Sequence, residues 1–579
     1  RPVVRMMMQV DPRREFPRRF VPTDADMGDW AQVEPLFRQL LARPINSMEE
    51  LEQWLYDCSE LGGALAEERA RRYIAMTTQT DDPVREQAYN QFVREIDPKT
   101  KPMWDALDRA YLANSYRKML RMDRYGVMDR IVENNVDLFR EENVPLETEE
   151  ALLSKDYQKL TGAMTVTYKG QELTLQQAAK FLDETDRRVR QDVWELVVRR
   201  RLQDRDAIEE LYDKLVDLRM RIAKNAGFDN YRDYAFKRRR RFDYTTQDCY
   251  QFHEGVERAM LPLVKRVYED RRRKLGIRSL RPWDTQVDPL GRPPLRPFEA
   301  ADELIKGCEE IFRRVDPELG DQFKFMGEEK LLDLESRKGK APGGYQSTLH
   351  ERRWPFIFMN AVGREEDVRT LLHEGGHAFH QLASREDPLI YYRTTPYEFA
   401  EVASMGMELL AAPHLNVFYR DESEFKRSYR NTLEDAALIF PWIATIDAFQ
   451  HWVYTHIGHS RDERRKSWLE IYRRFQPSLD WSGYEDALNY LWHRQLHLFT
   501  SPFYYIEYGI AETGALQVWL QSRTNHRAAV ERYWQALSLG GSKPLPRLFE
   551  AAGAKFKFDY ETLKPLADAV GEELDRIGD

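Results

Sequence analysis

Helical periodicity is the sequence feature that most limits how this chain can fold. Apolar residues recur at spacings of three and four along stretches such as Leu175 to Ala226 and Thr246 to Lys274. The stretch Leu280 to Phe298 contains five prolines and a glycine, which exclude a continuous helix there. We therefore expect a mainly α protein whose helices are interrupted near the middle of the chain.

One short segment breaks the helical pattern. "WPFIFMN", Trp354 to Asn360, is aromatic and apolar, which is typical of a β-strand. Pro355 has no N–H to donate to a neighbouring strand, so the sequence predicts a strand at the edge of its sheet. We expect a small β-sheet near the centre of the chain, surrounded by helices.

Length and charge narrow the class of protein. A chain of 579 residues exceeds one simple core and indicates two or three lobes or one large helical assembly. The net charge of −9 argues against a nucleic-acid partner. The basic run "KRRRR", Lys237 to Arg241, could serve as a nucleic-acid patch. With this overall charge we interpret it as a solvated helix end or loop.

The cysteines and the lack of long apolar runs favour a reducing cellular compartment and a location outside the membrane. Cys58, Cys249 and Cys308 are far apart and form no CxxC motif, which fits a reducing environment better than a disulfide framework. No stretch reaches the roughly 18 apolar residues of a membrane span. Residues 1–20 lack the apolar centre of a signal peptide. We expect a cytoplasmic protein without a membrane partner.

The segment "HEGGHAFH", His373 to His380, concentrates groups that bind metals. It lies in a stretch with an apolar stripe of helical period. His373 and His377 are four apart and therefore share a helix face, where two imidazoles can bind one Zn²⁺. Glu374 is then placed to reach an attacking water. Roughly 0.04 matches to a His-acidic-x-x-His pattern are expected by chance in this composition.

Three neighbours within this segment need a separate interpretation. Gly375 and Gly376 lower helix stability by about 1 kcal/mol each relative to alanine. Close approach of another chain segment or of a substrate would explain them, and we expect them to keep the helix face bare where a peptide passes. His380 could be a third ligand, but a supporting position behind the ligands fits better, because catalytic zinc sites keep one coordination position open.

A third ligand is expected from a second helix. Thr395, Pro396 and Glu398 are typical of an N-cap, a first-turn proline and a capping-box glutamate. The helix would present Glu401 and Glu408 on one face, two turns or roughly 10 Å apart, so both cannot bind one ion. We predict that Glu401 completes a His₂Glu site and that Glu408 supports a ligand histidine.

Aromatic residues gather near the C-terminus. The stretch "WHRQLHLFTSPFYYIEYGIAETGALQVW" holds His497, Tyr504, Tyr505 and Tyr508. Their polar tips could donate to the oxyanion that forms during peptide hydrolysis. Spacing alone favours the other interpretation, in which they are core aromatics with satisfied hydroxyl groups.

Taken together, these motifs resemble the thimet oligopeptidase superfamily of zinc metallopeptidases, and within it the oligoendopeptidase F branch. The resemblance rests on "HEGGHAFH", on "FAEVASMGMELL" and on "HLFTSPFYYIEYGIAETGA". Further similar segments are "RIAKNAGFDNYRDYAF", "KGKAPGGYQ" and "LSLGGSKPLPRLFEAAGAKFKFD". It extends from about Leu175 to Tyr560 and is weak before residue 170.

The resemblance implies a fold and a set of site residues. The fold would be a two-lobed helical metallopeptidase with a deep substrate channel and a small sheet beside the HExxH helix. Residues 1–170 would form an N-terminal helical lobe and residues 171–579 the catalytic region, with the zinc site in 345–410 and a substrate stretch in 490–520. One Zn²⁺ per chain is implied, with His373, His377 and Glu401 as its ligands and Glu374 as the general base. The implied oxyanion donors are His497, Tyr505 and Tyr508, with Tyr504 as the alternative to Tyr505. The implied substrate contacts come from a closing loop of Gly343, Gly344 and Tyr345 and from the strand residues Phe356 and Phe358.

The implied function is zinc-dependent endopeptidase activity on short unstructured peptides. A carboxypeptidase or dipeptidase on the same scaffold is an alternative, because the sequence does not show whether the channel is open at both ends. An inactive zinc- or peptide-binding module is another, although Glu374 would then have no purpose. Whether the chain is a monomer or a homodimer stays open.

Overall fold

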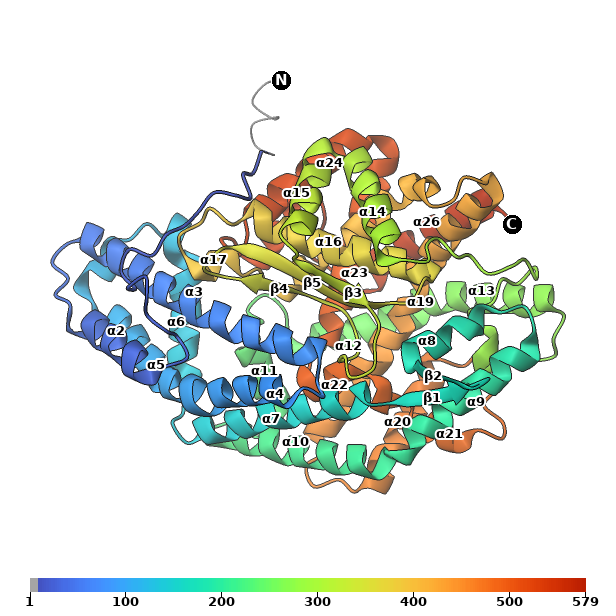
Figure 1. Ribbon diagram of the computed structural model, residues 1–579, viewed down its shortest axis with the longest axis horizontal. Coiled ribbons are helices and arrows are strands. Elements are labelled where there is room, and N and C mark those ends of the chain that lie inside the picture. The colour runs from blue at the N-terminus through green and yellow to red at the C-terminus, as the bar shows by residue number, and fades with distance from the viewer. Residues whose placement is uncertain (1–8) are drawn as a thin grey trace.

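The protein is mainly helical, as the periodicity predicts (Figure 1). The computed structural model describes residues 9–579. The interpretation of residues 1–20 therefore falls partly outside the described residues. Within that range, no helix combines the length and the apolar character needed to cross a membrane. The proline-rich stretch 280–298 is irregular apart from one short 3₁₀ turn, as predicted.

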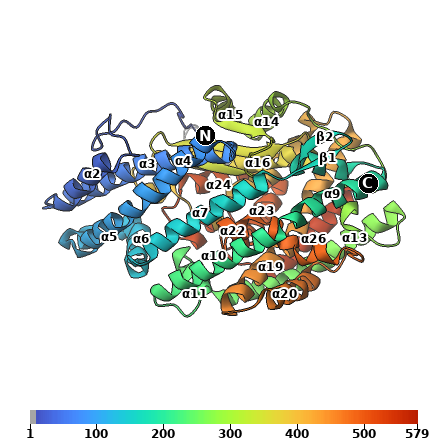
Figure 2. The ribbon, with the colours of Figure 1, turned by 60° about the horizontal axis from the view of Figure 1, so that its bottom comes forward.

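The N-terminal third consists of long helices that precede a β-hairpin. These elements are α2 (Trp30–Ala42), α3 (Met48–Thr78), α4 (Pro83–Gln91), α5 (Asp97–Ala113), α6 (Met122–Leu138), α7 (Asn143–Gly162), β1 (Thr165–Tyr168) and β2 (Gln171–Thr174). The helices up to the proline-rich stretch are α8 (Leu175–Ala179), α9 (Arg187–Gln203), α10 (Arg205–Asn225), α11 (Tyr231–Arg238), α12 (Thr246–Gly255) and α13 (Leu261–Leu275). Figure 2 shows α7 and α10 running side by side along one face.

The central region carries the second sheet, and helices alone follow it. The central elements are α14 (Ala301–Val315), α15 (Pro317–Glu328), β3 (Leu332–Glu335), β4 (Tyr345–Leu349), β5 (Trp354–Ala361), α16 (Glu365–Ala383), α17 (Ile390–Arg393) and α18 (Tyr397–Ala411). The C-terminal helices are α19 (Glu422–Thr455), α20 (Arg461–Phe475), α21 (Glu485–Asn489), α22 (Leu496–Thr500), α23 (Tyr505–Thr524), α24 (His526–Ser538), α25 (Leu545–Ala551) and α26 (Tyr560–Ile577). Short 3₁₀ or π segments are η1 (Phe92–Ile96), η2 (Ser115–Met119), η3 (Lys180–Asp183), η4 (Val256–Met260), η5 (Pro282–Asp284), η6 (Ala412–Val417) and η7 (Leu491–Arg494).

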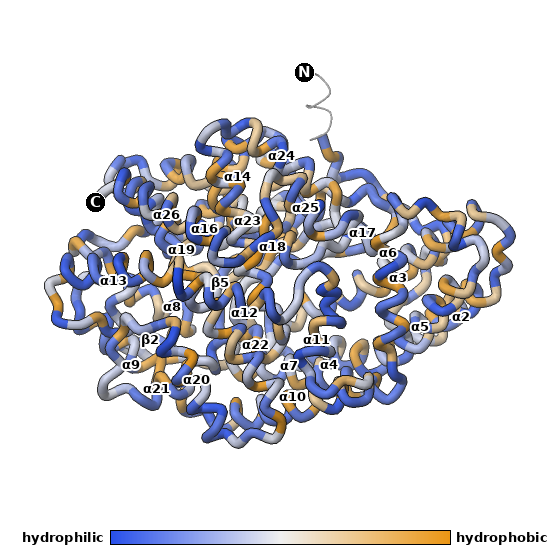
Figure 3. The backbone as a smooth tube through the Cα atoms, turned by 180° about the vertical axis from the view of Figure 1, so that it is seen from behind, coloured by the Kyte–Doolittle hydropathy of each residue, from blue (hydrophilic) through white to orange (hydrophobic). Residues whose placement is uncertain are grey.

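The main core surrounds α18, which packs against both α16 and α23. Hydrophobic residues recur along these central elements, whereas hydrophilic residues dominate the outer loops (Figure 3). A second core joins the N-terminal helices to Leu389 and Tyr392, which lie next to α16 in the sequence. The N-terminal helices are thereby tied to the central region, and the predicted boundary near residue 170 stays a prediction.

The predicted strand exists, but its predicted edge position is wrong. β5 is the middle strand of the order β3-β5-β4, parallel to β3 and antiparallel to β4. Pro355 is tolerated because pairing with β3 begins only at Ile357, two residues further on. The proline therefore lies at the beginning of a central strand, where β5 is paired with β4 but not yet with β3, and β3 and β4 are the edge strands.

The glycine pair has a packing function that differs from the predicted one. A methyl group at Gly376 would lie 2.7 Å from the Cα of Ser404 in α18, and one at Gly375 would collide with the ring of Phe312. Both glycines therefore face neighbouring helices. The expectation that they keep the helix bare for a passing peptide is wrong, and close approach of another chain segment is the correct explanation.

This packing predicts a stability difference between two glycine variants. Gly376→Ala should lower the free energy of unfolding by about 1–3 kcal/mol, because α16 and α18 must separate to admit the methyl group. Gly327→Ala is the matched control, since Gly327 is also helical and nothing lies within 4 Å of the added atom. It should raise the free energy of unfolding by up to about 1 kcal/mol. Urea unfolding curves measure both, and equal stability of the two variants would contradict the tight helix contact.

Candidate active site

Helix α16 presents the three chemical groups of the His-Glu-x-x-His motif. The helix begins after Arg364, and the carboxylate of Asp367 accepts the backbone N–H of Arg364. His373 and His377 lie one turn apart with ring centroids 5.1 Å from each other. Glu374 is 5% exposed, so its carboxylate is held inside the protein.

Helix α18 brings a third group to the two histidines. Glu401 Oε2 lies 3.2 Å from His373 Nε2 and 3.2 Å from His377 Nε2. The donor atoms of these three residues all lie within 4.8 Å of one another. Two imidazoles and a carboxylate are the ligand types of a catalytic zinc site. The three groups predicted as ligands therefore converge in a geometry that fits a metal ion.

Hydrogen bonds from behind orient two of these groups. His373 Nδ1 lies 2.9 Å from Glu408 Oε2, which leaves Nε2 facing Glu401. The hydroxyl of Tyr504 donates to Glu401 Oε1 at 2.6 Å, and Ser404 Oγ donates to Oε2 at 2.7 Å. Burial would raise the pKa of Glu401, but the adjacent His377 and His373 hold it well below its usual range. The carboxylate is therefore ionised and fixed in direction.

Glu374 differs from Glu401 in having a free oxygen. Its Oε2 is buried and has no hydrogen-bond partner within the described residues. Burial raises the pKa of Glu374 above its usual value, although the two histidines oppose the shift. A Cβ atom at Gly344 would lie 3.5 Å from Glu374 Oε1, so the Gly343–Gly344 turn covers this carboxylate. Such an unpaired, desolvated carboxylate is suited to proton transfer.

A chain of hydrogen bonds fixes His497 and Tyr508 next to this cluster. The indole N–H of Trp442 donates to Gln495 Oε1 at 2.9 Å, so the Gln495 Nε2 must donate to His497 Nδ1, at 2.8 Å. His497 then carries its proton on Nε2 and donates to the hydroxyl oxygen of Tyr508 at 2.9 Å. Burial lowers the pKa of His497 to about 4, so the ring is neutral near pH 7. The O–H of Tyr508 remains available as a donor.

The three tyrosines do not occupy equivalent places. Tyr504 and Tyr508, four residues apart, line the same cavity as His373, Glu374 and Glu401. Tyr505 is 8% exposed and lines a neighbouring cavity beside Glu408 and Glu512, which His373, Glu374, His497 and Tyr508 also line. Tyr508 lines both cavities and is the better placed of the two predicted donors, and the oxyanion role of Tyr505 stays a prediction. Tyr504 donates a hydrogen bond to Glu401, a predicted metal ligand, in addition to lining the cavity. The spacing of four residues between Tyr504 and Tyr508 was the sequence signal that they share a helix face.

The cavity lined by His373, Glu374 and Glu401, called the ligand cavity because it contains the predicted metal ligands, has a volume of about 580 Å³ and is bordered by the edge strand β4. Gln346 and Ser347 of β4 line it, together with Gly344 and Tyr345. Tyr345 donates to or accepts from Thr77 at 2.6 Å, which ties its side chain to α3.

The predicted substrate strand needs a correction. Phe356 and Phe358 belong to β5, are 9% and 0% exposed, and Phe358 stacks on Tyr345 with ring centroids 4.5 Å apart. Phe356 pairs with Ser347 of β4, and at Ile357 and Phe358 both main-chain edges of β5 are paired. The structure therefore does not support the prediction that these two residues and their strand contact substrate, and β4 offers a free edge.

The expected cap of α18 is also wrong. The helix begins at Tyr397 with Pro396 at the cap and no side-chain capping bond. Thr395 Oγ1 lies 3.1 Å from His380 Nε2 instead, and burial lowers the pKa of His380 to about 3. Glu398 is 2% exposed, and burial together with nearby Glu507 raises its pKa to about 8. His380 lies outside the converging ligand group, in agreement with a supporting position.

The basic run is a solvated helix end only in its first two residues. Lys237 and Arg238 are exposed at the end of α11, as expected. Arg241 is 7% exposed, and its guanidinium donates to the carbonyl of Phe503 and to Glu507. Arg239 donates to the carbonyl of Pro502 at 2.8 Å and to the same glutamate. For Arg239 and Arg241 the interpretation as a solvated segment is wrong, because they hold the loop that precedes Tyr504.

Fold and site together show a large, mainly helical protein with a candidate metal centre between two helices. The chain belongs to peptidase family M3: the family model matches residues 180–567, and the model of the peptidase M3 N-terminal domain matches residues 20–139. This confirms the family resemblance in the sequence.

Known relatives and structures agree with this family. An oligoendopeptidase F homolog of Borreliella burgdorferi is 26% identical over 303 residues, which are 50% of this chain and 49% of that protein. The chain thus matches about half the length of this curated relative. The structure of PZ peptidase A with inhibitor 2 is similar with a TM-score of 0.92 and 27% identity, over 96% of this chain and 99% of that one. A putative oligoendopeptidase F from Bacillus anthracis is similar with a TM-score of 0.88 and 25% identity, over 97% and 99%.

Proposed function

We propose that the protein is a zinc-dependent endopeptidase that hydrolyses peptide bonds in short, unstructured oligopeptides. The observation that carries this proposal is the convergence of His373, His377 and Glu401 in a cavity that also holds the unpaired carboxylate of Glu374. Membership of peptidase family M3 supports the reaction class.

The residues that would hold the zinc ion fit it chemically. Glu401 Oε2 and the two Nε2 atoms form an open set of three donors, and catalytic zinc sites use three protein ligands. When bound, the ion supplies a water of lowered pKa and polarises the scissile carbonyl group. Glu408 and Tyr504 orient the ligands through hydrogen bonds to His373 and Glu401. Substitution of such supporting residues usually lowers metal affinity by about 10–100-fold.

Glu374 is the proposed general base. Its Oε2 has no hydrogen-bond partner in the described residues, so it can accept the proton of the attacking water without first losing a hydrogen bond to the protein. Burial raises its pKa, which makes the carboxylate a better proton acceptor. The protonated carboxyl group then delivers this proton to the leaving amine as the peptide bond breaks.

Tyr508 and His497 are the proposed stabilisers of the oxyanion. The neutral His497 ring donates to the hydroxyl oxygen of Tyr508, so the O–H of Tyr508 can donate to the oxygen that gains charge. Donors that are fixed before the reaction contribute most, because no reorganisation is needed when charge develops. Trp442 and Gln495 contribute by fixing the tautomer of His497.

The edge strand β4 is the proposed guide for the peptide backbone. Its free edge lies along the ligand cavity, and an extended peptide can pair with it through main-chain hydrogen bonds. Such pairing reads the backbone, so we expect broad tolerance of side chains. The Gly343–Gly344 turn above Glu374 is the part of the predicted closing loop that meets the substrate, because Tyr345 is already tied to Thr77.

Glu374→Gln combined with product mapping tests the proposal. The wild type should cut a ten-residue peptide at internal bonds, and the variant should retain its metal while cleavage falls by about 10²–10⁴-fold, because the amide cannot accept a proton. Mass spectrometry of the products and metal quantitation measure both. Removal of single or paired residues from one end would contradict endopeptidase activity. Undiminished turnover by the metal-loaded variant would contradict the role of Glu374.

The hydrogen-bond chain from Trp442 through Gln495 and His497 to Tyr508 predicts that substitutions at its two ends have similar effects on kcat. Tyr508→Phe should lower kcat by about 10²–10³-fold with little change in KM. Gln495→Glu should also lower kcat. A carboxylate accepts a hydrogen bond from His497 Nδ1–H, so Nε2 then carries no proton and accepts the O–H of Tyr508 instead of donating to it. Tyr505→Phe is the matched control and should keep kcat near the wild-type value. A larger loss for Tyr505→Phe than for Tyr508→Phe would contradict this assignment, and nitrogen NMR shifts of His497 report the tautomer directly.

A further inference from the structure

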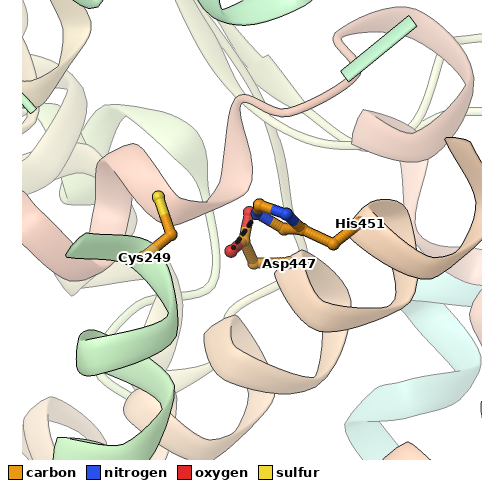
Figure 4. A group of neighbouring side chains, drawn as sticks. All are labelled: Cys249, Asp447 and His451. Atoms are coloured by element: carbon orange, nitrogen blue, oxygen red, sulfur yellow. Dashed lines mark ion pairs between the residues drawn. The ribbon is translucent and has the colours of Figure 1, made fainter. Parts of the chain in front are cut away.

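A second group of metal-binding side chains lies between α12 and α19. Cys249 comes from α12, and Asp447 and His451 come from successive turns of α19 (Figure 4). Their donor atoms, a sulfur, a carboxylate oxygen and a ring nitrogen, lie within 4.8 Å of one another. His253 is one turn after Cys249 on α12, and its Nε2 lies 2.7 Å from Asp447 Oδ2. Each helix thus contributes two groups spaced by four residues.

The group is buried and incompletely hydrogen-bonded. Cys249 and Asp447 are 0% exposed and His451 is 3% exposed. Within residues 9–579, Asp447 Oδ1 has no hydrogen-bond partner, and the two ring nitrogens of His451 have none either. His451 Nε2 lies 3.2 Å from Asp447 Oδ2 without forming a hydrogen bond to it. Buried polar atoms are nearly always paired, so three unpaired atoms at one place indicate a missing partner.

A catalytic triad and a plain ion pair both fit this group less well than a metal site. A nucleophilic Cys-His-Asp triad needs access for a substrate, yet burial raises the pKa of the Cys249 thiol, and the side chains of Cys249 and Asp447 are 0% exposed. Contacts of His253 and His451 with Asp447 Oδ2 account for that oxygen but leave Asp447 Oδ1 and His451 Nδ1 without hydrogen-bond partners in the described residues.

We propose that Cys249, Asp447 and His451 bind a structural transition-metal ion of the zinc type, which clamps α12 to α19. A thiolate, an imidazole and a carboxylate are zinc ligands, and the two negative charges balance a divalent cation. His253 donates to the ligand Asp447, as outer partners of metal ligands commonly do. Donors bound at 2.0–2.3 Å stand about 3.5 Å apart, so the three donors, within 4.8 Å of one another, would have to move closer by up to about 1 Å, and a fourth donor such as a water would complete the shell. Binding releases the thiol proton to solvent, and the buried ion enters during folding.

The clamp would also support the candidate active site. Gln450, beside His451 on α19, accepts the backbone N–H of Phe503 at 2.7 Å. The rings of His451 and Phe503 meet edge to face at 5.5 Å. Phe503 has a φ of 64° and immediately precedes Tyr504, which donates to Glu401. An ion that fixes α19 here would therefore fix the loop that places Tyr504.

Cobalt replacement in the full-length protein tests this site without relying on activity. The protein is refolded with Co²⁺ as the only metal, and absorption from thiolate-to-cobalt charge transfer is recorded. His373, His377 and Glu401 include no sulfur, so this absorption can come only from a cysteine. It should be present in the wild type, absent in Cys249→Ser and unchanged in Cys308→Ser. Cys308 is the matched control because it is a buried free cysteine outside every metal-binding group in the described residues.

A second pair of variants keeps the test decisive if Cys249→Ser does not fold. His373→Ala/His377→Ala should retain one ion per chain with the sulfur absorption, whereas Asp447→Asn should lose that absorption and keep the other ion. Metal quantitation and circular dichroism accompany both measurements. No sulfur absorption in folded, cobalt-loaded wild type, or no metal in the double variant, would overturn the second site. Neither result would affect the proposal for the peptidase site, which depends on other residues.

Discussion

The contact between α16 and α18 at Gly376 is the constraint on which the site depends. Because Gly376 has no side chain, the backbone of α18 at Ser404 can approach the helix that carries His373 and His377. This approach places Glu401, three residues before Ser404, within 3.2 Å of both histidines. A helix separation larger by the size of a methyl group would move the carboxylate away from the point where the donors converge. Packing of backbone on backbone therefore sets the geometry of the proposed metal centre.

Fixed hydrogen bonds, rather than flexible side chains, give each group of the site its direction. The two oxygens of Glu401 have different partners, since Tyr504 binds Oε1 and Oε2 faces the histidines. The indole of Trp442 can only donate, and this single fact determines the amide orientation of Gln495 and the tautomer of His497. Glu374 is the exception, because its Oε2 is left unpaired. The unpaired group is the one to which we assign proton transfer.

The helical class and the shared face of His373 and His377 were predictable because they depend on local periodicity, whereas the family and the convergence of Glu401 were predicted from whole motifs and their resemblance to known peptidases. His373 and His377 share a face through the helical repeat alone. Properties that depend on distant segments were not predictable. Pro355 indicated an edge strand, but strand order is set by β3 and β4, which the local pattern does not show. Thr395 looked like a helix cap, yet it contacts His380 from the preceding helix. The basic run looked solvated throughout because the partners of its last residues, Pro502 and Glu507, lie more than 260 residues away.

The central claim is that peptide cleavage requires one metal ion held by His373, His377 and Glu401 in front of Glu374. Zinc titration of chelator-treated protein tests it most directly, with the cleavage rate of a quenched peptide measured after each addition. The buried ion proposed near Cys249 should resist the chelator, whereas the ion in the open cavity should be removed. The rate should rise from near zero in proportion to added zinc and level off at one equivalent per chain. Full cleavage activity of the chelator-treated protein before any zinc is added would contradict the claim.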